Sequence, residues 1–383
     1  MLVGMSITTS GRFMKQPFTV SCDDNTLYVG RSEEDNYTKI QDALDNASDG
    51  DTVFVYNGTY VENLIVDKSI NLVGEDKNTT VIDGNKTGDV VNIVANQVIV
   101  SGFTICRGGR YGVHLDESGN IIIENIIRAN RKGICCSASN DNNISGNSFF
   151  DNIEGIWLSN GNYNVISGNS FSLGMTWSVY VDVSDDNIIT DNTINSTGRG
   201  AGGDGLYGEI LFNGICHRNI IANNTLFNFN GTYRGGIHFY RELMGIGSHD
   251  NIIVGNSISS YDYPGIAIHC GFNNIVLGNT IRNNGWGVYL SRCWITNVSG
   301  NKLFNNNWGI ALLSSRLNNI YQNIFKNNNK SATFGMLSIG NRWRDNYWDK
   351  PRMHPYPIIG RIGLHTPSWI NFDWHPAQEP YDI

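Results

Sequence analysis

Short strands of the pattern Gly-Ile/Val-x-apolar recur along the chain, and their x positions carry side chains that could do chemistry. Strand alternation places the x residue and the residue two positions later on the same outer face. The first of these two columns includes Trp157, Tyr180, Tyr207 and His238. The second includes Asp182, Glu209, Tyr240 and His269.

The first column predicts a carbohydrate-binding strip made of Trp157, Tyr180, Tyr207 and His238, with His269 beside it. Aromatic rings pack on the apolar C–H faces of sugars, while polar neighbours satisfy the hydroxyls. The alternative is structural, because aromatic side chains that stack on neighbouring strands also stabilise a sheet.

The second column supplies candidate catalytic residues. Asp182 and Glu209 are expected on adjacent coils, where two carboxylates could act as general acid and base, and Tyr240 is a third candidate. Whether the chain is an enzyme stays open; if it is, the class is polysaccharide lyase, epimerase or glycoside hydrolase. Arg234 and Arg241 could hold acidic sugars through bidentate contacts, or form a solvated loop face.

Two histidines suggest a metal site. His217 and His249 have the same phase, each two residues before the Asn that opens the next strand. Cys216, Met244 or His238 could complete a soft site of the kind that copper prefers. The alternative is a pair of corner histidines bonded to the backbone.

A repeated asparagine sets the elements that position these residues. It recurs at intervals of 22, 22, 23, 32, 32, 23, 22 and 22 residues, at Asn125, Asn147, Asn169, Asn192, Asn224, Asn256, Asn279, Asn301 and Asn323. A fixed period of this length indicates stacked repeats. Because Asn tolerates the left-handed conformation and stacked amides bond to each other, we expect a tight bend and an Asn ladder in every coil.

The fold expected from this period is all-β: a right-handed parallel β-helix of about eleven to thirteen coils with three short strands each. From Thr52 onward the chain consists of β-branched runs of 4–6 residues bounded by Gly, Asn or Asp. The two 32-residue intervals, within 192–256, hold about ten extra residues each, which we expect in surface loops on a binding face.

The two ends of the stack need caps, since terminal repeats must cover an open apolar surface. Residues 36–48 place Ile40, Ala43, Leu44 and Ala47 on one helical face and predict an N-terminal capping helix. We divide the chain into a leader or irregular segment at 1–26, the β-helix at 27–342 and a Trp- and Pro-rich cap at 343–383.

Composition excludes some functions. Charged residues make up 16% of the chain and the net charge is −8, which argues against nucleic-acid binding. The apolar segments are too short and polar to span a membrane. The cysteines form no CxxC; Cys270 and Cys293, about one coil apart, could form a disulfide or remain buried thiols. Frequent Asn-X-Ser/Thr triplets suit a secreted glycoprotein, although the N-terminal residues are too few for a complete signal peptide.

The opening IQDALDNASDGDTVFVYNGTYVENLIVDKSINLVGED, the repeated N-x-I-x-x-N and GI-x-L units and the tail NRWRDNYWDK resemble NosD-like parallel β-helix proteins, secreted archaeal members among them. The resemblance covers about residues 27–383. It implies an extracellular or cell-surface β-helix of a superfamily that includes carbohydrate-active enzymes. It carries over no catalytic residue, and it leaves copper or calcium as cofactors to be tested.

These observations lead to one leading function and two alternatives. The leading function is a secreted or surface protein that binds, and could process, polysaccharide or glycoprotein glycans near the loops at 192–256. The first alternative is a purely structural surface protein that self-associates. The second is a copper-binding accessory protein of the NosD type.

Overall fold

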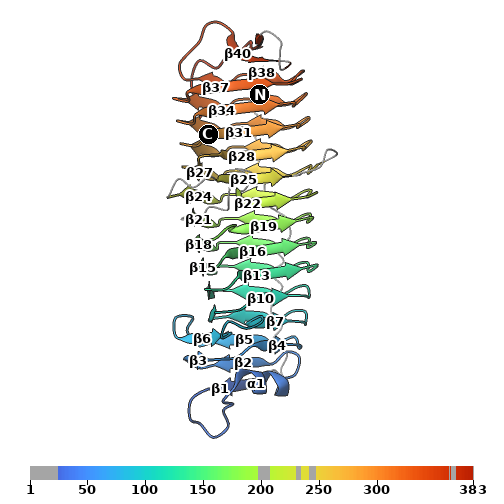
Figure 1. Cartoon of the computed structure of the whole chain (residues 1–383), viewed down its shortest axis with the longest axis vertical. Coiled ribbons are helices and arrows are strands. Elements are labelled where there is room, and N and C mark those ends of the chain that lie inside the picture. Colours follow the sequence, from blue (N-terminus) through green and yellow to red (C-terminus); the bar gives the residue numbers. More distant parts are fainter. Residues whose placement is uncertain are drawn as a thin grey trace.

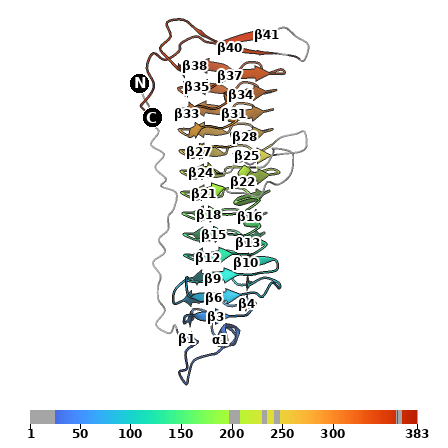
Figure 2. The ribbon, with the colours of Figure 1, turned by 60° about the vertical axis from the view of Figure 1, so that its left-hand side comes forward.

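The chain forms a long parallel β-helix of about 14 turns with one short helix, so the predicted fold is confirmed with about one turn more than the upper expectation. The computed structural model describes residues 25–196, 208–229, 234–240, 247–361, 363 and 368–382. Figures 1 and 2 show a straight rod with the helix at one end and a hairpin over the other. The strands stack in three columns, called here faces A, B and C.

Face A opens each coil. Its strands are β1 (Thr26–Val29), β2 (Thr52–Val55), β5 (Asn71–Gly74), β8 (Ile99–Ser101), β11 (Ile121–Ile123), β14 (Asn143–Ser145), β17 (Val165–Ser167), β20 (Ile188–Thr190), β23 (Ile220–Ala222), β26 (Ile252–Val254), β29 (Ile275–Leu277), β32 (Asn297–Ser299), β35 (Asn319–Tyr321), β38 (Arg342–Arg344) and β41 (Ser368–Asp373).

Face B follows face A in each coil and forms a separate 13-stranded sheet. Its strands are β3 (Gly58–Tyr60), β6 (Thr80–Asp83), β9 (Thr104–Cys106), β12 (Ile126–Arg128), β15 (Ser148–Phe150), β18 (Ser170–Ser172), β21 (Thr193–Ser196), β24 (Thr225–Asn228), β27 (Ser257–Ser259), β30 (Thr280–Arg282), β33 (Lys302–Phe304), β36 (Ile324–Lys326) and β39 (Tyr347–Trp348).

Face C carries the candidate site and runs down the middle of Figure 1. Its strands are β4 (Leu64–Val66), β7 (Val91–Ile93), β10 (Tyr111–Leu115), β13 (Lys132–Ser137), β16 (Glu154–Ser159), β19 (Val179–Asp182), β22 (Gly208–Asn213), β25 (Gly235–Tyr240), β28 (Pro264–His269), β31 (Trp286–Ser291), β34 (Trp308–Leu313), β37 (Lys330–Gly335) and β40 (Tyr356–Arg361).

The repeat places like residues above one another. Ile122, Ile144 and Ile166 pair directly in register and are completely buried. Phe149 and Phe171 stack with their ring centroids 4.7 Å apart. Because apolar side chains at every second position fill the interior of each coil, burial at roughly 25 cal/mol per Å² stabilises the whole length of the rod.

The predicted Asn ladder is present at the bend between faces A and B. Both the backbone N–H and the Nδ2 of Asn125 donate to Oδ1 of Asn147, at 3.0 and 3.2 Å, and the pattern continues along the stack. The left-handed conformation, however, lies one residue before each ladder Asn, for example at Glu124 and Gly146. The Asn itself is therefore free to turn its amide inward, where it satisfies buried backbone groups.

Two further ladders occupy the other bends. Asn120, Asn142 and Asn164 begin one between faces C and A. The third, between faces B and C, includes Asn130 and Asn152 and resumes at Asn284 and Asn306. Met175 and Tyr261 take ladder places in between. This interruption coincides with the long coils that the intervals between the asparagines predicted.

The caps complete the ends. Helix α1 (Ile40–Asn46) buries Ile40, Ala43 and Leu44, as predicted. At the other end, antiparallel β40 and β41 cross the last coil, and Asp373 Oδ2 accepts hydrogen bonds from the N–H and Nδ2 of Asn346 and from Nε1 of Trp348. A carboxylate, which only accepts, thus ends the amide ladder. Trp343 and Trp348 are buried, whereas Trp369 and Trp374 are exposed.

The six cysteines in the described ranges are free. Cys270 and Cys293 are both free and buried, and Cys293 Sγ lies 3.1 Å from the carbonyl oxygen of Ile268. The register explains why: His269 pairs with Ser291, so Cys270 faces Arg292 rather than Cys293. No disulfide is present in the part of the chain that the structure describes.

Candidate functional site

The outer side of face C brings the sequence-predicted residues into register, with one correction. Trp157 pairs with Tyr180, as expected, but the next residue in the column is Leu211, followed by His238. In the second column, Asp182 pairs with Asn213 and not with Glu209. The alignment of this coil was therefore wrong by four residues. Glu209 occupies the position at which most of the repeated face C strands have Gly. Aligning the strands on that Gly therefore gave the wrong register for this coil. Tyr207 and Arg241 lie outside the described residues.

Trp157 and Tyr180 form a stacked patch, a name used here for Lys132, Trp157, Trp177 and Tyr180. The rings of Trp157 and Tyr180 lie 3.9 Å apart and nearly parallel. From the preceding coil, Lys132 places its Nζ 3.1 Å from the centroid of the Trp157 ring and also pairs with Glu154. Because the neighbours before and after Trp157 cover both of its faces, this ring offers no free platform to a sugar.

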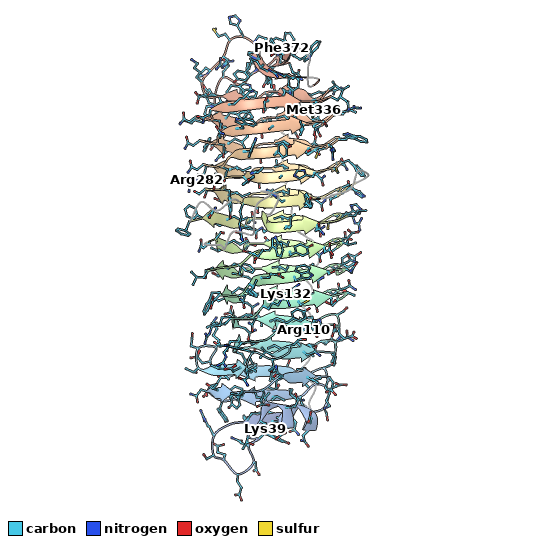
Figure 3. All side chains as sticks on the ribbon, in the orientation of Figure 1. Lys39, Arg110, Lys132, Arg282, Met336 and Phe372 are labelled. Carbon is cyan, nitrogen blue, oxygen red and sulfur yellow. The ribbon has the colours of Figure 1, made fainter. Side chains whose placement is uncertain are left out.

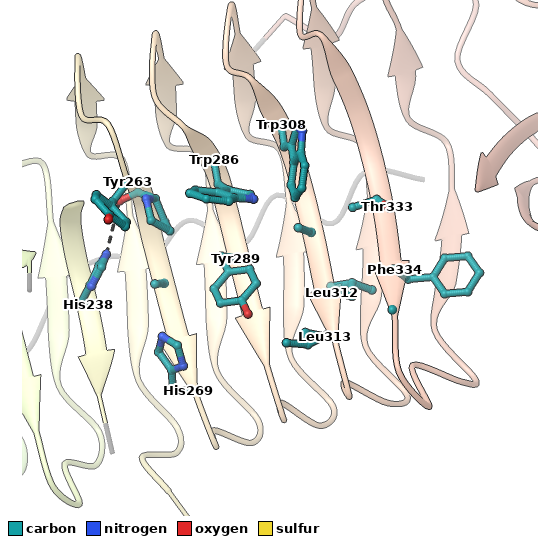
Figure 4. A pocket seen from close by; sticks show the side chains of 14 residues that line it. His238, Tyr263, His269, Trp286, Tyr289, Trp308, Leu312, Leu313, Thr333 and Phe334 are labelled. Atoms are coloured by element: carbon teal, nitrogen blue, oxygen red, sulfur yellow. Dashed lines mark hydrogen bonds between the residues drawn. The ribbon is translucent and has the colours of Figure 1, made fainter. Parts of the chain in front are cut away.

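Further along face C the outer surface opens into a cavity of about 440 Å³, called here the aromatic groove (Figure 4). Its rings come from consecutive coils: His238, Tyr263, His269, Trp286, Tyr289 and Trp308. Trp286 and Trp308 meet edge to face at 5.3 Å and 90°, and His269 and Tyr289 meet at 5.6 Å and 66°. In contrast to the stacked patch, these rings do not cover one another.

Small residues make room for the groove. The outward column reads His238, Ala267, Tyr289, Ala311 and Thr333 in successive coils. Parallel strands lie roughly 4.8 Å apart, so two large side chains paired in register contact each other, either stacked, as in Trp157–Tyr180, or edge to face, as in Trp286–Trp308. Alternation of large and small residues therefore leaves space beside Tyr289, whereas the large–large sequence Trp157–Tyr180 closes it.

The groove also offers polar groups. The indole N–H of Trp286 is buried and donates to no acceptor among the described residues. Burial raises the pKa of the Tyr289 hydroxyl, which therefore stays protonated at neutral pH. Burial lowers the pKa of His269 to about 4, with nearby His238 and Arg292 acting in the same direction, so His269 is neutral at pH 7.

The expected carboxylate pair is not assembled. Glu209 is buried and accepts from Arg234 Nη1 at 3.1 Å and from the Ser178 hydroxyl at 2.9 Å. Arg234 Nη1 also donates to the carbonyl oxygen of Met175, so this ion pair fills the interruption in the third ladder. Asp182 accepts from Asn213 on the outer face. In the register, Asp182 and Glu209 are offset by four positions along the strand, roughly 13 Å.

Tyr240 lies next to His269, at one end of the aromatic groove, and their ring centroids are 6.0 Å apart. Among the described residues that line the groove there is no carboxylate. Sequence reasoning missed Trp286, Trp308 and Tyr263. The repeated Trp-Gly at 286–287 and 308–309, one coil apart and next to outward alanines, is the signal that could have found the two tryptophans.

Comparison with known proteins places this architecture in a family. The profile of NosD, described as "Periplasmic copper-binding protein (NosD)", matches residues 44–236 and 216–362. The chain belongs to the NosD family. It is also similar to a protein named cell surface glycoprotein from Methanothermus fervidus, 34% identical over 96 residues that make up 24% of this chain and 16% of that protein. The matched segment is thus a small part of the relative.

Several solved structures share the fold of this NosD-family chain. An alginate lyase in complex with G6 has a TM-score of 0.61 at 13% identity, covering 84% of this chain and 85% of that chain. The A-module of the Azotobacter vinelandii mannuronan C-5 epimerase has a TM-score of 0.50 at 12% identity, covering 89% and 94%. At this identity the likeness concerns the fold: a β-helix similar to carbohydrate-active enzymes.

The family description raises the question of copper. The rings of His217 and His249 stack face to face at 3.5 Å, and the backbone N–H of His249 donates to His217 Nδ1. His249 Nδ1 is 2.7 Å from Asp250. Cys216 is buried, and burial raises the pKa of its thiol to about 12. The described ranges contain no group of three or more His, Cys, Asp or Glu that could hold a metal ion.

The histidine pair is therefore a stacked corner in this structure, with backbone and carboxylate partners. His238, a candidate ligand and a member of the predicted sugar-binding strip, lines the aromatic groove but is only 2% exposed. Met244 lies outside the described residues. Within the described ranges, no helix is long and apolar enough to cross a membrane.

Proposed function

We propose that this NosD-family protein binds glycans at the cell exterior and that the sugar chain lies in the aromatic groove of face C. The observation that carries the proposal is the set of aromatic rings, several of them part-exposed, that line a cavity of about 440 Å³ on the outer surface. Trp286, Tyr289 and Trp308 present edges and faces at different angles, which suits a ligand with apolar C–H faces and hydroxyl edges.

The polar groups of the groove support a sugar over a purely apolar ligand. The indole N–H of Trp286 is closed to water in the free protein, so it would gain a sugar hydroxyl or ring oxygen as acceptor only if the neighbouring rings shift on binding. A buried donor without a partner costs about 1–3 kcal/mol, so a ligand oxygen that supplies one is favoured by a similar amount. The protonated hydroxyl of Tyr289 can both donate and accept.

The geometry favours binding over processing. Acid–base cleavage of a glycosidic bond uses two carboxyl groups on either side of the bond. The described lining of the groove holds none, Glu209 is buried against Arg234, and Asp182 lies on an earlier coil beyond Leu211. We therefore assign the groove to recognition and not to hydrolysis by a pair of carboxyl groups.

Location at the cell exterior is supported by two relationships. The similar protein of Methanothermus fervidus is named a cell surface glycoprotein, and the family description is periplasmic. A straight rod with a recognition surface on one face suits such a place, since a solenoid presents an extended binding surface.

The experiment is retention on a glycan array by the wild type, Trp308→Ala and Trp157→Ala. We expect wild type and Trp157→Ala to bind the same glycans and Trp308→Ala to lose at least about tenfold in affinity, since a central aromatic contributes about 1.4 kcal/mol or more. Circular dichroism verifies that both variants are folded. Equal binding by Trp308→Ala, or no glycan bound by the wild type, would overturn the proposal.

A further inference from the structure

A second, polar groove lies beside the aromatic one, at the bend between faces B and C. It has a volume of about 400 Å³ and is lined mainly by amides, called here the amide groove: Asp262, Asn283, Asn305, Asn307 and Asn329. All five side chains are exposed. Nδ2 of Asn329 donates to Oδ1 of Asn307 at 2.9 Å, which fixes the orientation of both amides.

The two grooves share coils. Gly285 and Asn307 line the amide groove, and the next residues in the chain, Trp286 and Trp308, line the aromatic groove. Backbone hydrogen bonds from Trp308 to Gly285 and from Asn307 to Asn284 hold the two coils together at this edge. Trp308 is 36% exposed, so a ligand can pass across this ring from one groove to the other.

The charges around the grooves define the ligand. The described lining of the aromatic groove contains no Lys, Arg, Asp or Glu, and His269 is neutral. The cations nearby are on the rim: Lys330 pairs in register with Trp308, and Arg292 follows β31. A carboxylate placed in the groove would lose water and find no Lys or Arg to pair with among the described lining residues, which disfavours an anionic ligand.

The amide groove favours a ligand that has both hydrogen-bond donors and hydrogen-bond acceptors. Each Asn side chain provides both donors and acceptors, the combination that hydroxyl and acetamido groups can satisfy. Because Nδ2 of Asn329 donates to Oδ1 of Asn307, the pair would offer a ligand one donor group, Nδ2 of Asn307, and one acceptor, Oδ1 of Asn329. The carboxylate of Asp262 is the charged group in this lining, and it disfavours an anion.

Resting on the proposed function, we infer that the ligand is an uncharged, hydroxyl-rich glycan that runs around the rod, from the aromatic groove across Trp308 into the amide groove. This ligand class differs from alginate and mannuronan, after which two of the structural neighbours, a lyase and an epimerase, are named. Because the two grooves are neighbours around the rod, we expect the glycan to run around the rod and not along its long axis.

The first test compares one uronic-acid polysaccharide with its carboxyl-reduced form, which has the same backbone without the charge. Affinities are measured by calorimetry at pH 7. We expect the reduced form to bind at least tenfold tighter. Equal or tighter binding of the charged form would overturn this inference while leaving glycan binding itself intact; binding of neither form, with an empty glycan array, would overturn both.

The second test measures the path across the rod with neutral oligosaccharides of increasing length. Asn307→Ala should not change the affinity for the shortest binding oligosaccharide and should weaken longer ones at least fivefold, whereas Trp308→Ala weakens all lengths. Asn57→Ala, an exposed amide near the other end of the rod, is the matched control and should have no effect. A length-independent effect of Asn307→Ala, or none, would refute the path.

A third variant tests whether a cation at the edge of the aromatic groove contributes to ligand binding. Lys330→Ala removes the cation beside Trp308 and should leave the affinity for the neutral glycan within twofold. A tenfold or greater loss would show that the rim cation binds the ligand, and it would overturn the assignment to an uncharged sugar.

Discussion

Two aromatic clusters lie on the same face of the same rod, and only one of them is open. In the stacked patch, Trp157 is covered by Tyr180 on one side and Lys132 on the other. Figure 3 shows Lys132 on this part of face C. In the aromatic groove, Trp286 and Trp308 meet at 90° and leave a cavity.

The difference shows that aromatic content alone does not make a binding surface on a β-helix. Consecutive coils are so close that two large outward side chains can stack and cover each other's faces, as Trp157 and Tyr180 do. Where Ala267 and Ala311 separate the large residues, the rings remain accessible. The small residues therefore determine where the groove lies, and the tryptophans determine what it can bind.

The largest effect is expected from closing the groove without removing any ring. Ala311→Phe places a third large side chain next to Tyr289, which converts the groove into the large–large arrangement of the stacked patch. Glycan affinity should fall at least about 100-fold, or about 2.7 kcal/mol, while stability changes little because the side chain points outward. Calorimetry with the best array ligand measures this.

Ala311→Ser, which keeps the cavity, is the control for that variant. If Ala311→Phe bound the glycan as tightly as Ala311→Ser, the shape of the groove would not matter and the comparison of the two clusters would fail.

Acid should lower the free energy of unfolding of the protein through His269 in the aromatic groove. The stacked patch contains no histidine and should make no such contribution. The pKa of His269 is about 4 in the folded protein, below its ordinary value of 6.5. Between these two values the unfolded chain binds a proton that the folded chain does not, so stability falls as the pH decreases from 6.5 toward 4. This contribution is about 2 kcal/mol by pH 4.5.

The measurement is urea unfolding of the wild type and His269→Phe at pH 7 and pH 4.5. The wild type should lose about 2 kcal/mol more than the variant over this interval. His217, whose pKa is also lowered, titrates in both proteins and cancels in the difference. Parallel pH dependences would show that His269 is not the group responsible.

Removing the ring of the stacked patch should affect stability and not binding. Trp157→Ala deletes the stack on Tyr180 and the cation–π contact with Lys132, and we expect a loss of about 1.5 kcal/mol in the free energy of unfolding. Glycan affinity should stay within twofold of the wild type. An affinity loss of tenfold would restore the patch as a binding site.

The sequence was sufficient to predict the regular part of this molecule. The Asn period predicted the fold and the position of the long coils, because each coil repeats the same local chemistry, and the apolar spacing within 36–48 predicted the capping helix. It also placed Trp157, Tyr180 and Asp182 on one outer face, where the register has them. The prediction failed at Glu209, where a buried ion pair with Arg234 replaces the glycine by which the other strands were aligned.

The groove could not be predicted in the same way. It exists because Ala267 and Ala311 are small, and a missing side chain is a weak signal in a list of candidate ligands. The angles between Trp286, Tyr289 and Trp308 depend on packing between coils, which no pattern within one coil encodes. The same holds for His217 and His249. Their equal positions in consecutive coils correctly predicted that they are neighbours, but only the structure shows that their rings stack.

The smallest effect is expected at Lys132, which has two partners. Its Nζ lies 3.3 Å from Glu154 and 3.1 Å from the centroid of Trp157. Lys132→Met keeps the packing of the stem and removes the charge, so we expect a stability loss of about 0.5–1 kcal/mol. A double-mutant cycle with Trp157→Ala isolates the contact with the ring, and its coupling energy should be about 0.5 kcal/mol. A coupling near zero in urea unfolding would mean that Lys132 serves Glu154 alone, and that the lower face of Trp157 is covered by the length of the side chain rather than held by its charge.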